Sequence, residues 1–351
     1  MIYSFIFSFL LTFFLIPIIK QIGLKYKFVD LPNHRKVHKK PKVRIGGLAI
    51  FIGVISAIFF KKIILENGFS SLYGDKNLLI YVISAAIFFL IGFIDDLFKL
   101  SAYFRLSFQI IASTIIWHYG FGFFNISLFD SSYLINLKLL PIISYLVTVL
   151  WISGMINAIN WIDGLDGLAI GFSIISSISF LIVSIFLSND IAALISISLL
   201  GASLAFLIFN FPPSRILMGD GGSYFLGLTF ANLGIIGSKF NNLDASNTEV
   251  NLIILPFFIF FIPIFDASFV IIKRLIDKSS PFKPDKNHIH HRLMGLGYNQ
   301  EETTQLILIA SMMTSSLGLY FLSGEISLII FFISFLFLSY IVLQKKKFKI
   351  F

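Results

Sequence analysis

Long apolar runs separated by short polar segments constrain this chain more than any other feature. Runs of about 20 apolar residues are long enough to cross a bilayer as helices. They fall near residues 2–22, 45–60, 78–94, 103–118, 141–158, 168–187, 191–210, 222–237, 251–272, 305–322 and 325–343. The sequence therefore predicts an all-α integral membrane protein with about eleven transmembrane helices.

Composition supports this class. Hydrophobic residues make up 57% of the 351 positions and charged residues only 13%, and the mean hydropathy is +0.91. These values are typical of a membrane protein. The absence of cysteine excludes disulfides, iron–sulfur clusters and thiolate zinc sites. Because no internal repeat, soluble domain or low-complexity tract is visible, we expect residues 1–351 to form a single polytopic domain.

The basic residues predict the orientation in the membrane. A net charge of +9 could indicate nucleic-acid binding, but the lysines and arginines lie in short loops beside apolar spans, so no nucleic-acid partner is predicted. Threading eleven spans puts 22 of the 27 basic residues on one side, which is then cytoplasmic. This map predicts an outside N-terminus on a retained anchor, a cytoplasmic C-terminus and an active site built from cytoplasmic loops.

The most informative stretch is NAINWIDGLDGL, residues 157–168. Asn157, Asn160, Asp163 and Asp166 follow one another at steps of three, so on a helix they share one face. Burying such groups without partners costs several kcal/mol each, roughly, which favours a cation or a hydrogen-bonding ligand. The alternative is an ordinary polar helix end followed by a glycine-rich turn.

The first cytoplasmic loop, DLPNHRKVHKKPKVRIGG, carries six basic residues between Arg35 and Arg44, including Lys36, and ends at Gly46-Gly47. Free backbone N–H groups at a helix start would favour an anion such as a lipid phosphate or a pyrophosphate. A plain positively charged loop, held by anionic lipid head groups, is the alternative.

The next loop begins at Asp95-Asp96, with Lys99 and Arg105 following. Adjacent acids cannot share a helix face, so one can approach a metal or act as a base while the other orients the helix end. A carboxylate at a helix C-terminus is disfavoured by the dipole, which argues against a purely stabilising role.

Two later loops complete the candidate site. MGDGGS surrounds Asp220 with glycines, which would allow close approach of a phosphate and supply an oxygen ligand for Mg²⁺, although a simple Asp-Gly turn is the alternative. The loop SPFKPDKNHIHHRL holds His288, His290 and His291 beside Arg292. Zinc is a weaker interpretation there, because a fourth ligand at the usual spacing is missing and basic neighbours suit an anion.

The motifs DLPNHRKVHKKPKVRIGGLAIF, IGFIDDLFKL, NAINWIDGLDGLA, MGDGGSYFLG and PDKNHIHHRL together resemble those of the polyprenyl-phosphate N-acetylhexosamine-1-phosphate transferases. The resemblance spans about residues 24–297 in order, and HIHHRL is more similar to the WecA-like branch than to the MraY branch. It implies transfer of an N-acetylhexosamine 1-phosphate, with N-acetylglucosamine as the default, from a UDP-sugar to undecaprenyl phosphate, with release of UMP.

The resemblance also implies residue roles. Mg²⁺, or Mn²⁺ in its place, is expected at Asp220 and Asn160. The remaining expected roles are catalytic for Asp95, Asp96, Asp163 and His290, donor-binding for Asn157, Asp166, His288, His291 and Arg292, and phosphate-binding for Lys36, Arg44 and Arg105. The expected location is the bacterial cytoplasmic (inner) membrane, where such enzymes initiate cell-envelope polysaccharides such as O-antigen or teichoic acid. Membrane lipids surround the chain there, and a homodimer is an open option.

Physical reasoning favours the same chemistry. Two mutually repelling anions must meet, so a metal ion and cationic loops have to neutralise them. An acceptor phosphate is already an anionic nucleophile, which favours direct attack over a covalent aspartyl intermediate. A secondary transporter would place its acids near the bilayer midplane, and a lipid-binding scaffold would need the basic loop without the four aspartates. A phosphatidyl-alcohol-type phosphotransferase would need aspartates on consecutive helical turns, and that array is absent.

Overall fold

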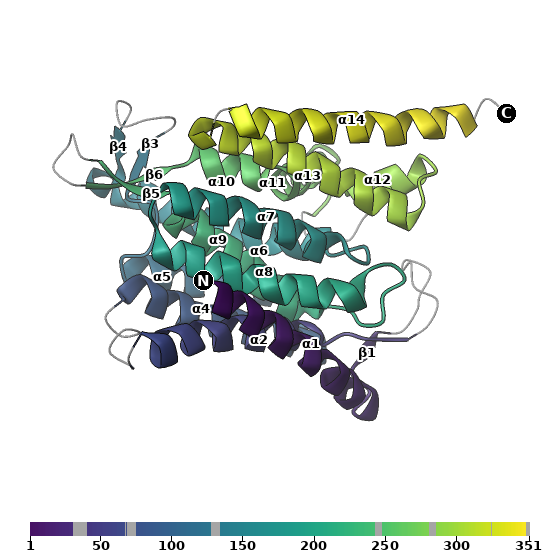
Figure 1. Ribbon diagram of the computed structural model, residues 1–351, viewed down its shortest axis with the longest axis horizontal. Helices are drawn as coiled ribbons and strands as arrows, with labels where there is room; N and C mark the ends of the chain where they lie inside the picture. Colours follow the sequence, from purple (N-terminus) through teal and green to yellow (C-terminus); the bar gives the residue numbers. More distant parts are fainter. Residues whose placement is uncertain are drawn as a thin grey trace.

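The computed structural model describes residues 1–30, 41–66, 68, 75–127, 134–242, 248–280, 286–323 and 325–348. Within these ranges the chain is mostly helical (Figure 1). Seven helical segments are long and apolar enough to cross a membrane. They are α1 (Ile2–Lys25), α2 (Gly47–Phe59) with the π-helical turn Phe60–Leu65, α4 (Lys76–Phe98), α6 (Pro141–Ile162), α7 (Leu168–Phe186), α8 (Asp190–Asn210) and α13 (Gln300–Ser323). The prediction of a helical multi-pass membrane protein is confirmed at this level.

Two further helices coincide with predicted spans but do not meet the same criteria of length and hydropathy, α5 (Ala102–His118) and α9 (Gly219–Ile236). Helix α14 (Glu325–Phe348) also coincides with a predicted span, and residues Ser327–Ser339 form its described apolar part. A short helix, α12 (Ile289–Gly295), carries the histidine motif. The count of eleven spans, and the side on which each terminus lies, stay predictions.

The predicted span 251–272 is not a single helix. Its first residues belong to strand β6 (Thr248–Leu252), and the helical part is divided into α10 (Ile254–Ile259) and α11 (Phe261–Ile276). Pro263 accounts for the division, because it has no N–H to donate to the carbonyl of Ile259 and its ring crowds that carbonyl.

Two small sheets were not predicted from the sequence. β1 (Val29–Asp30) pairs with β2 (Lys42–Val43) in antiparallel fashion. A second sheet has the order β4-β3-β6-β5, formed by β4 (Leu134–Asn136), β3 (Asn125–Ser127), β6 and β5 (Lys239–Asn242). In Figure 1 this sheet lies at one end of the helices, and α12 lies near the opposite end. Strands this short lack the repeated alternation that identifies a strand in a sequence.

Helix α9 is the centre of the fold, since all but one of its residues are buried. Glycines permit close approach of its first turn to two neighbours. A Cβ on Gly47 of α2 would lie 2.2 Å from the Cα of Gly222, and one on Gly92 of α4 would lie 2.8 Å from the Cα of Gly221. Small residues at helix contacts allow such backbone approach inside a membrane.

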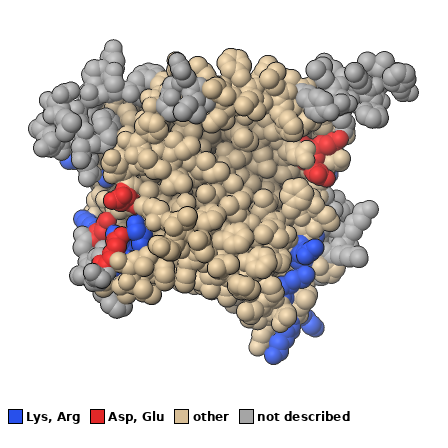
Figure 2. Space-filling model, in the orientation of Figure 1, with Lys and Arg blue, Asp and Glu red and all other residues tan. Residues whose placement is uncertain are grey.

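Figure 2 shows a broad face of the molecule free of charged groups, with lysine, arginine and acidic side chains gathered toward its two ends. Large apolar side chains such as Phe14, Leu150 and Ile185 are exposed on the long helices. An apolar face with charged groups toward its ends is the surface expected of a protein that spans a bilayer.

Candidate active site

The strand and loop before α2 bring Arg44 to the beginning of α9. The N–H of Leu217 donates to the carbonyl of Val43 at 2.8 Å, and the N–H of Gly46 donates to the carbonyl of Leu217 at 3.0 Å. The N–H of Gly47 donates to the carbonyl of Met218 at 2.8 Å. The expectation that free amides at Gly46-Gly47 bind an anion is therefore wrong, because packing against α9 already uses them.

Asp96 fixes the first turn of α9. Its carboxylate accepts the N–H groups of Asp220 and Gly221, each at 2.9 Å, and Arg44 Nε lies 2.8 Å from Oδ1. Gly219, with φ +78°, is required here, since a Cβ would lie 2.6 Å from Asp96 Oδ2. The glycines around Asp220 thus serve helix contact and this turn. The close phosphate approach expected from the sequence stays a prediction.

Asp220 joins three segments of the site. Its carboxylate is paired with the Arg44 guanidinium and accepts a hydrogen bond from Asn160 Nδ2 at 2.8 Å. The same Asn160 nitrogen donates to Ser223 Oγ at 2.9 Å. Charges on Asp96 and Asp220 raise the pKa of Arg44, although burial opposes that shift. Asp96, Asp220, Asn160 and Arg44 therefore meet, as the sequence predicted for a common site.

The predicted helical face of four polar residues is only partly right. Helix α6 ends at Ile162, so Asn157 and Asn160 lie on the helix whereas Asp163 and Asp166 lie in the turn after it. Glycines end the helix, and Gly167 adopts φ +78° at the start of α7. The turn separates the two aspartates and gives them different partners.

Asp163 lies half-buried beside Asp220 and accepts no hydrogen bond from the described residues. Burial, followed by the neighbouring charges of Asp220 and Asp96, raises the pKa of Asp163 well above its ordinary value. Three carboxylates close together repel one another and favour a bound cation or a proton.

Asp166 is bound to the basic loop. Lys42 Nζ lies 2.8 Å from its Oδ2 and 2.7 Å from Ser214 Oγ, and the Ser214 N–H donates to Asp166 at 3.0 Å. Burial alone would raise the pKa of Asp166, but the hydrogen bonds from Lys42 and Ser214 hold it below its ordinary value. Asp166 is thus an ionised partner for a lysine that the sequence analysis did not single out.

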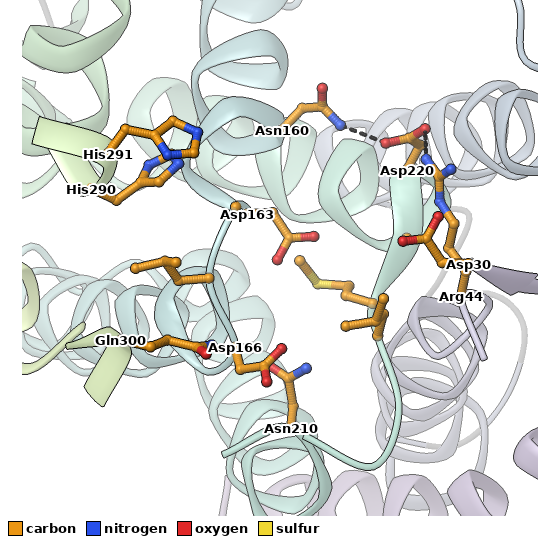
Figure 3. A pocket seen from close by; sticks show the side chains of 15 residues that line it. Asp30, Arg44, Asn160, Asp163, Asp166, Asn210, Asp220, His290, His291 and Gln300 are labelled. Carbon is orange, nitrogen blue, oxygen red and sulfur yellow. Dashed lines mark hydrogen bonds and ion pairs between the residues drawn. The ribbon is translucent and has the colours of Figure 1, made fainter. Parts of the chain in front are cut away.

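Arg44 and Asn160 line a polar cavity of about 330 Å³, together with Asp163, Asp166 and Asp220 (Figure 3). Asp163 and Asp220 come from opposite sides of it, and His290 and His291 form another wall. Gln300, Asn210 and Asp30 also line it, and these three were missed because single polar residues at predicted span ends carry no distinctive spacing.

A larger cavity of about 750 Å³ adjoins the polar one, and Asn160, Gly164, His290 and His291 line both. Its walls are mostly apolar. They come from α5, α6 and the α10–α11 region and include Leu106, Leu150, Met155, Phe257, Ile264 and Ile271. Its polar lining includes Arg105, Asn157, Arg274 and His288.

Asp95 and Asn157 belong to this second region. Asp95 is 3% exposed, accepts the Leu100 N–H at 2.7 Å and is bound by Arg105 Nη1 at 2.7 Å. Asn157 Nδ2 donates to Gln109 Oε1 at 2.6 Å. Asp95 and its neighbour Asp96 line neither of these two cavities. Asp95 binds Arg105, which lines the larger cavity, and Asp96 binds Arg44, which lines the polar one.

The histidine motif is attached to α11. His288 Nδ1 lies 2.8 Å from Asp266 Oδ2, and Arg292 stacks over Phe269 at 4.7 Å instead of lining either cavity. Burial, together with His291 and His288, lowers the pKa of His290 to about 3. Asp266 was missed, although a single acid inside an apolar span is itself a functional signal. Lys36 lies outside the described residues.

The fold and the two adjoining cavities define a class: a multi-pass membrane protein with a polar, carboxylate-lined cavity beside a mostly apolar one. Comparison identifies the family. Residues 78–238 match the model for glycosyl transferase family 4. The chain is 35% identical to the Bacillus subtilis (strain 168) "Probable undecaprenyl-phosphate N-acetylglucosaminyl 1-phosphate transferase", over 99% of this chain and 93% of the relative.

Two other relatives are a Mycobacterium leprae "Decaprenyl-phosphate N-acetylglucosaminephosphotransferase" and an Escherichia coli O157:H7 "Undecaprenyl-phosphate alpha-N-acetylglucosaminyl 1-phosphate transferase". The first is 31% identical over 85% of this chain and 78% of the relative. The second is 26% identical over 96% of this chain and 88% of the relative. The chain belongs to glycosyl transferase family 4, and the family resemblance seen in its motifs is confirmed.

Proposed function

We propose that this protein transfers N-acetylhexosamine 1-phosphate, with N-acetylglucosamine as the sugar, from its UDP conjugate to undecaprenyl phosphate and releases UMP. The observation that carries this proposal is the pair of adjoining cavities. One is small and polar, the other is large and mostly apolar, and they share Asn160, His290 and His291. A water-soluble nucleotide sugar suits the first cavity and a lipid phosphate suits the second. The names of the bacterial relatives support the same reaction.

Arg44 lines the polar cavity, and Lys42 is paired with Asp166, which also lines it. Each is held in place by buried or half-buried carboxylates, Lys42 by Asp166 and Arg44 by Asp96 and Asp220. Fixed cations of this kind bind a pyrophosphate and stabilise charge that develops during transfer without having to reorganise.

Mg²⁺ fits the acidic side of the polar cavity, and Mn²⁺ has the same preference for oxygen ligands. Asp220, Asp163 and the amide oxygen of Asn160 are the groups that would hold it. Among the described residues no three acidic or histidine side chains converge into a ready metal cluster, so an amide or substrate oxygens would complete the ligand set. The crowding of Asp163 with Asp220 and Asp96 supports a cation there. The ion would neutralise the donor's phosphates.

Arg105 is the phosphate-binding residue that we assign to the larger cavity. Asp95 fixes its guanidinium at 2.7 Å, and the apolar walls beyond it accommodate the polyprenyl chain. In this arrangement Asp95 aligns the acceptor through Arg105, and Asp96 organises the donor side through Arg44 and α9. Both acids therefore act on the reaction by positioning other groups.

The reaction that follows is a direct displacement. An oxygen of the acceptor phosphate attacks the sugar-linked phosphorus of the donor near the residues common to both cavities, and UMP leaves. The two cavities hold the reactants next to each other, and that proximity replaces a bimolecular encounter. A covalent intermediate gains little, because a phosphate oxygen is already a nucleophile.

The wider setting follows from this reaction. We infer a bacterial cytoplasmic membrane location, a cytoplasmic active site and a role in initiating a cell-envelope polysaccharide. The single domain over residues 1–351 and a homodimer remain predictions.

The test is a transfer assay on the full chain in detergent, with undecaprenyl phosphate, Mg²⁺ and labelled UDP-sugars. We expect label in a lipid product and stoichiometric UMP, with UDP-N-acetylglucosamine used best. UDP-N-acetylgalactosamine serves as the matched donor, because it differs at one hydroxyl. No lipid-linked product with any UDP-sugar would contradict the proposal.

A further inference from the structure

Asp266 is a buried carboxylate that the proposed reaction does not use. It lies on α11 with 4% of its surface exposed. Its Oδ2 lies 2.8 Å from Nδ1 of His288, and its Oδ1 accepts the backbone N–H of Ile289 at 2.7 Å. One carboxylate thus fixes both the ring of His288 and the beginning of α12.

The geometry determines which ring nitrogen carries the proton. An ionised carboxylate only accepts hydrogen bonds, so the Nδ1 atom facing it must be the donor. In the neutral imidazole Nε2 is then an acceptor. No described residue is hydrogen-bonded to Nε2, and His288 lines the larger cavity. Trp161 packs against the ring, with centroids 5.6 Å apart, and limits its rotation.

Aromatic and basic side chains lie around the His288 ring and along the same cavity. Arg274 stacks over Trp161 at 5.5 Å, and Arg105, Arg274 and His288 line the same cavity. His290 stacks on His288 at 5.8 Å, and its own ring touches that of His291 at 4.3 Å. Asp266 is the carboxylate that pairs with the His288 ring.

We propose that Asp266 is a positioning residue that locks His288 with Nε2 unprotonated, so that this atom accepts a hydrogen bond from a substrate O–H in the larger cavity. The O–H comes from a hydroxyl of the transferred sugar or from a protonated acceptor phosphate, and the two sources share one chemistry. This inference rests on the proposed function only for the identity of the substrates.

Asp266→Asn is the informative change. The amide oxygen can still accept the Ile289 N–H, but the amide nitrogen then faces Nδ1 and moves the ring proton to Nε2. We expect kcat/KM to fall by about 10-fold to 100-fold, the effect of losing one buried substrate hydrogen bond. A rise in KM confined to the UDP-sugar would identify the sugar hydroxyl as the source, and one confined to the polyprenyl phosphate would identify the acceptor.

A double-mutant cycle separates positioning from simple folding effects. If Asp266 acts through His288, the double variant Asp266→Asn/His288→Phe should be within about twofold of His288→Phe alone. Lys273→Met is the matched control, because Lys273 also ties this loop to α11, through Asn287 at 2.6 Å, without touching a histidine. The fold loss in kcat/KM of Lys273→Met should multiply with the fold loss of His288→Phe when the two changes are combined. If the fold losses in kcat/KM of Asp266→Asn and His288→Phe multiply in the double variant, the proposal is overturned.

A readout without turnover keeps the proposal independent of the proposed function. The chain has six histidines, so ¹⁵N NMR of imidazole-labelled protein can be assigned for His288 by comparison with His288→Phe. We expect a protonated Nδ1 in the native protein and a protonated Nε2 in Asp266→Asn. An unchanged tautomer would contradict the Asp266 assignment even if transfer activity is found, whereas absent activity with the expected tautomers would contradict only the proposed function.

Discussion

At the residue scale, two neighbouring acids perform separate tasks. Asp95 and Asp96 project about 100° apart on α4, as consecutive helical residues do. Asp95 reaches Arg105 in the larger cavity, and Asp96 reaches Arg44 and the amides of α9. The end of one helix thus contacts both an arginine that lines the larger cavity and an arginine that lines the polar cavity. The catalytic roles expected for the two acids stay predictions.

Replacing each acid should therefore have a different effect, on acceptor binding for Asp95 and on thermal stability for Asp96. We expect Asp95→Asn to raise KM for polyprenyl phosphate by about 10-fold to 100-fold, because one charge-assisted hydrogen bond to Arg105 is lost. KM for the UDP-sugar should change little. Asp96→Asn should instead lower the thermal unfolding midpoint, since an amide nitrogen would face the N–H groups of Asp220 or Gly221. Steady-state kinetics measure the two KM values, and thermal melts measure the unfolding midpoint. Equal effects of both changes on both KM values would contradict the division of tasks between Asp95 and Asp96.

Metal removal tests the acidic side of the polar cavity. Chelation should abolish turnover, and Mg²⁺ or Mn²⁺ should restore it, because carboxylate and amide oxygens suit both ions. Asp220→Ala should lose on the order of 10²-fold or more in kcat. Measured activity restored by Zn²⁺ alone would instead favour a histidine metal site.

His290 predicts a pH dependence of stability. Burial beside His291 and His288 lowers its pKa to about 3 from the ordinary 6.5. Between those values the unfolded chain binds the additional proton, so the free energy of unfolding falls as the pH falls from 6.5 toward 3. We expect His290→Phe to lose less stability than the native protein when the pH is lowered from about 6.5 to 4.5. Thermal melts at several pH values measure this, and parallel losses would refute it.

At the element scale, the site depends on how closely three helices approach. The sequence identified the polar residues well, because their spacing and loop positions are local features. It could not predict that Gly47 and Gly92 serve contact with α9, or that Asp266 reaches His288 across 22 positions. Those facts depend on long-range packing. The span was predicted as 141–158 and α6 extends to Ile162, but the helical face expected to reach Asp166 was too long, because the helix ends before Asp163.

Gly47→Val tests the contact of α2 with α9. Because a Cβ there would lie 2.2 Å from the Gly222 Cα, backbone must move, and overpacking of this kind costs typically about 1–3 kcal/mol. We expect a clearly lower thermal midpoint in detergent. Gly154→Ala on α6 is the control, since its Cβ would meet nothing within 4 Å, and its midpoint should stay close to that of the native protein. Equal midpoints for both variants would show that the close approach is unimportant.

At the scale of the whole molecule, the charge-free face of Figure 2 and the clustering of the site at one end predict a membrane orientation. Helix α12 and the beginning of α9 contribute residues to the site. The four-stranded sheet lies at the other end of the helices (Figure 1). A UDP-sugar is made in the cytoplasm, so the proposed reaction requires the site on that side. The excess of basic residues in the loops around the site points the same way.

Because the chain has no cysteine, single cysteines report this orientation without a background to remove. Lys25, Lys286 and Lys138 are exposed, and the first two flank site-bearing segments while Lys138 follows β4 in the sheet region. We expect a membrane-impermeant maleimide on intact cells to label Lys138→Cys only, and to label Lys25→Cys and Lys286→Cys after the membrane is opened. Each variant should retain transfer activity, which shows that the labelled molecules are folded. Labelling of Lys286→Cys from outside would place the histidine motif away from the cytoplasmic donor, and a reaction that needs a UDP-sugar could not then occur at this site.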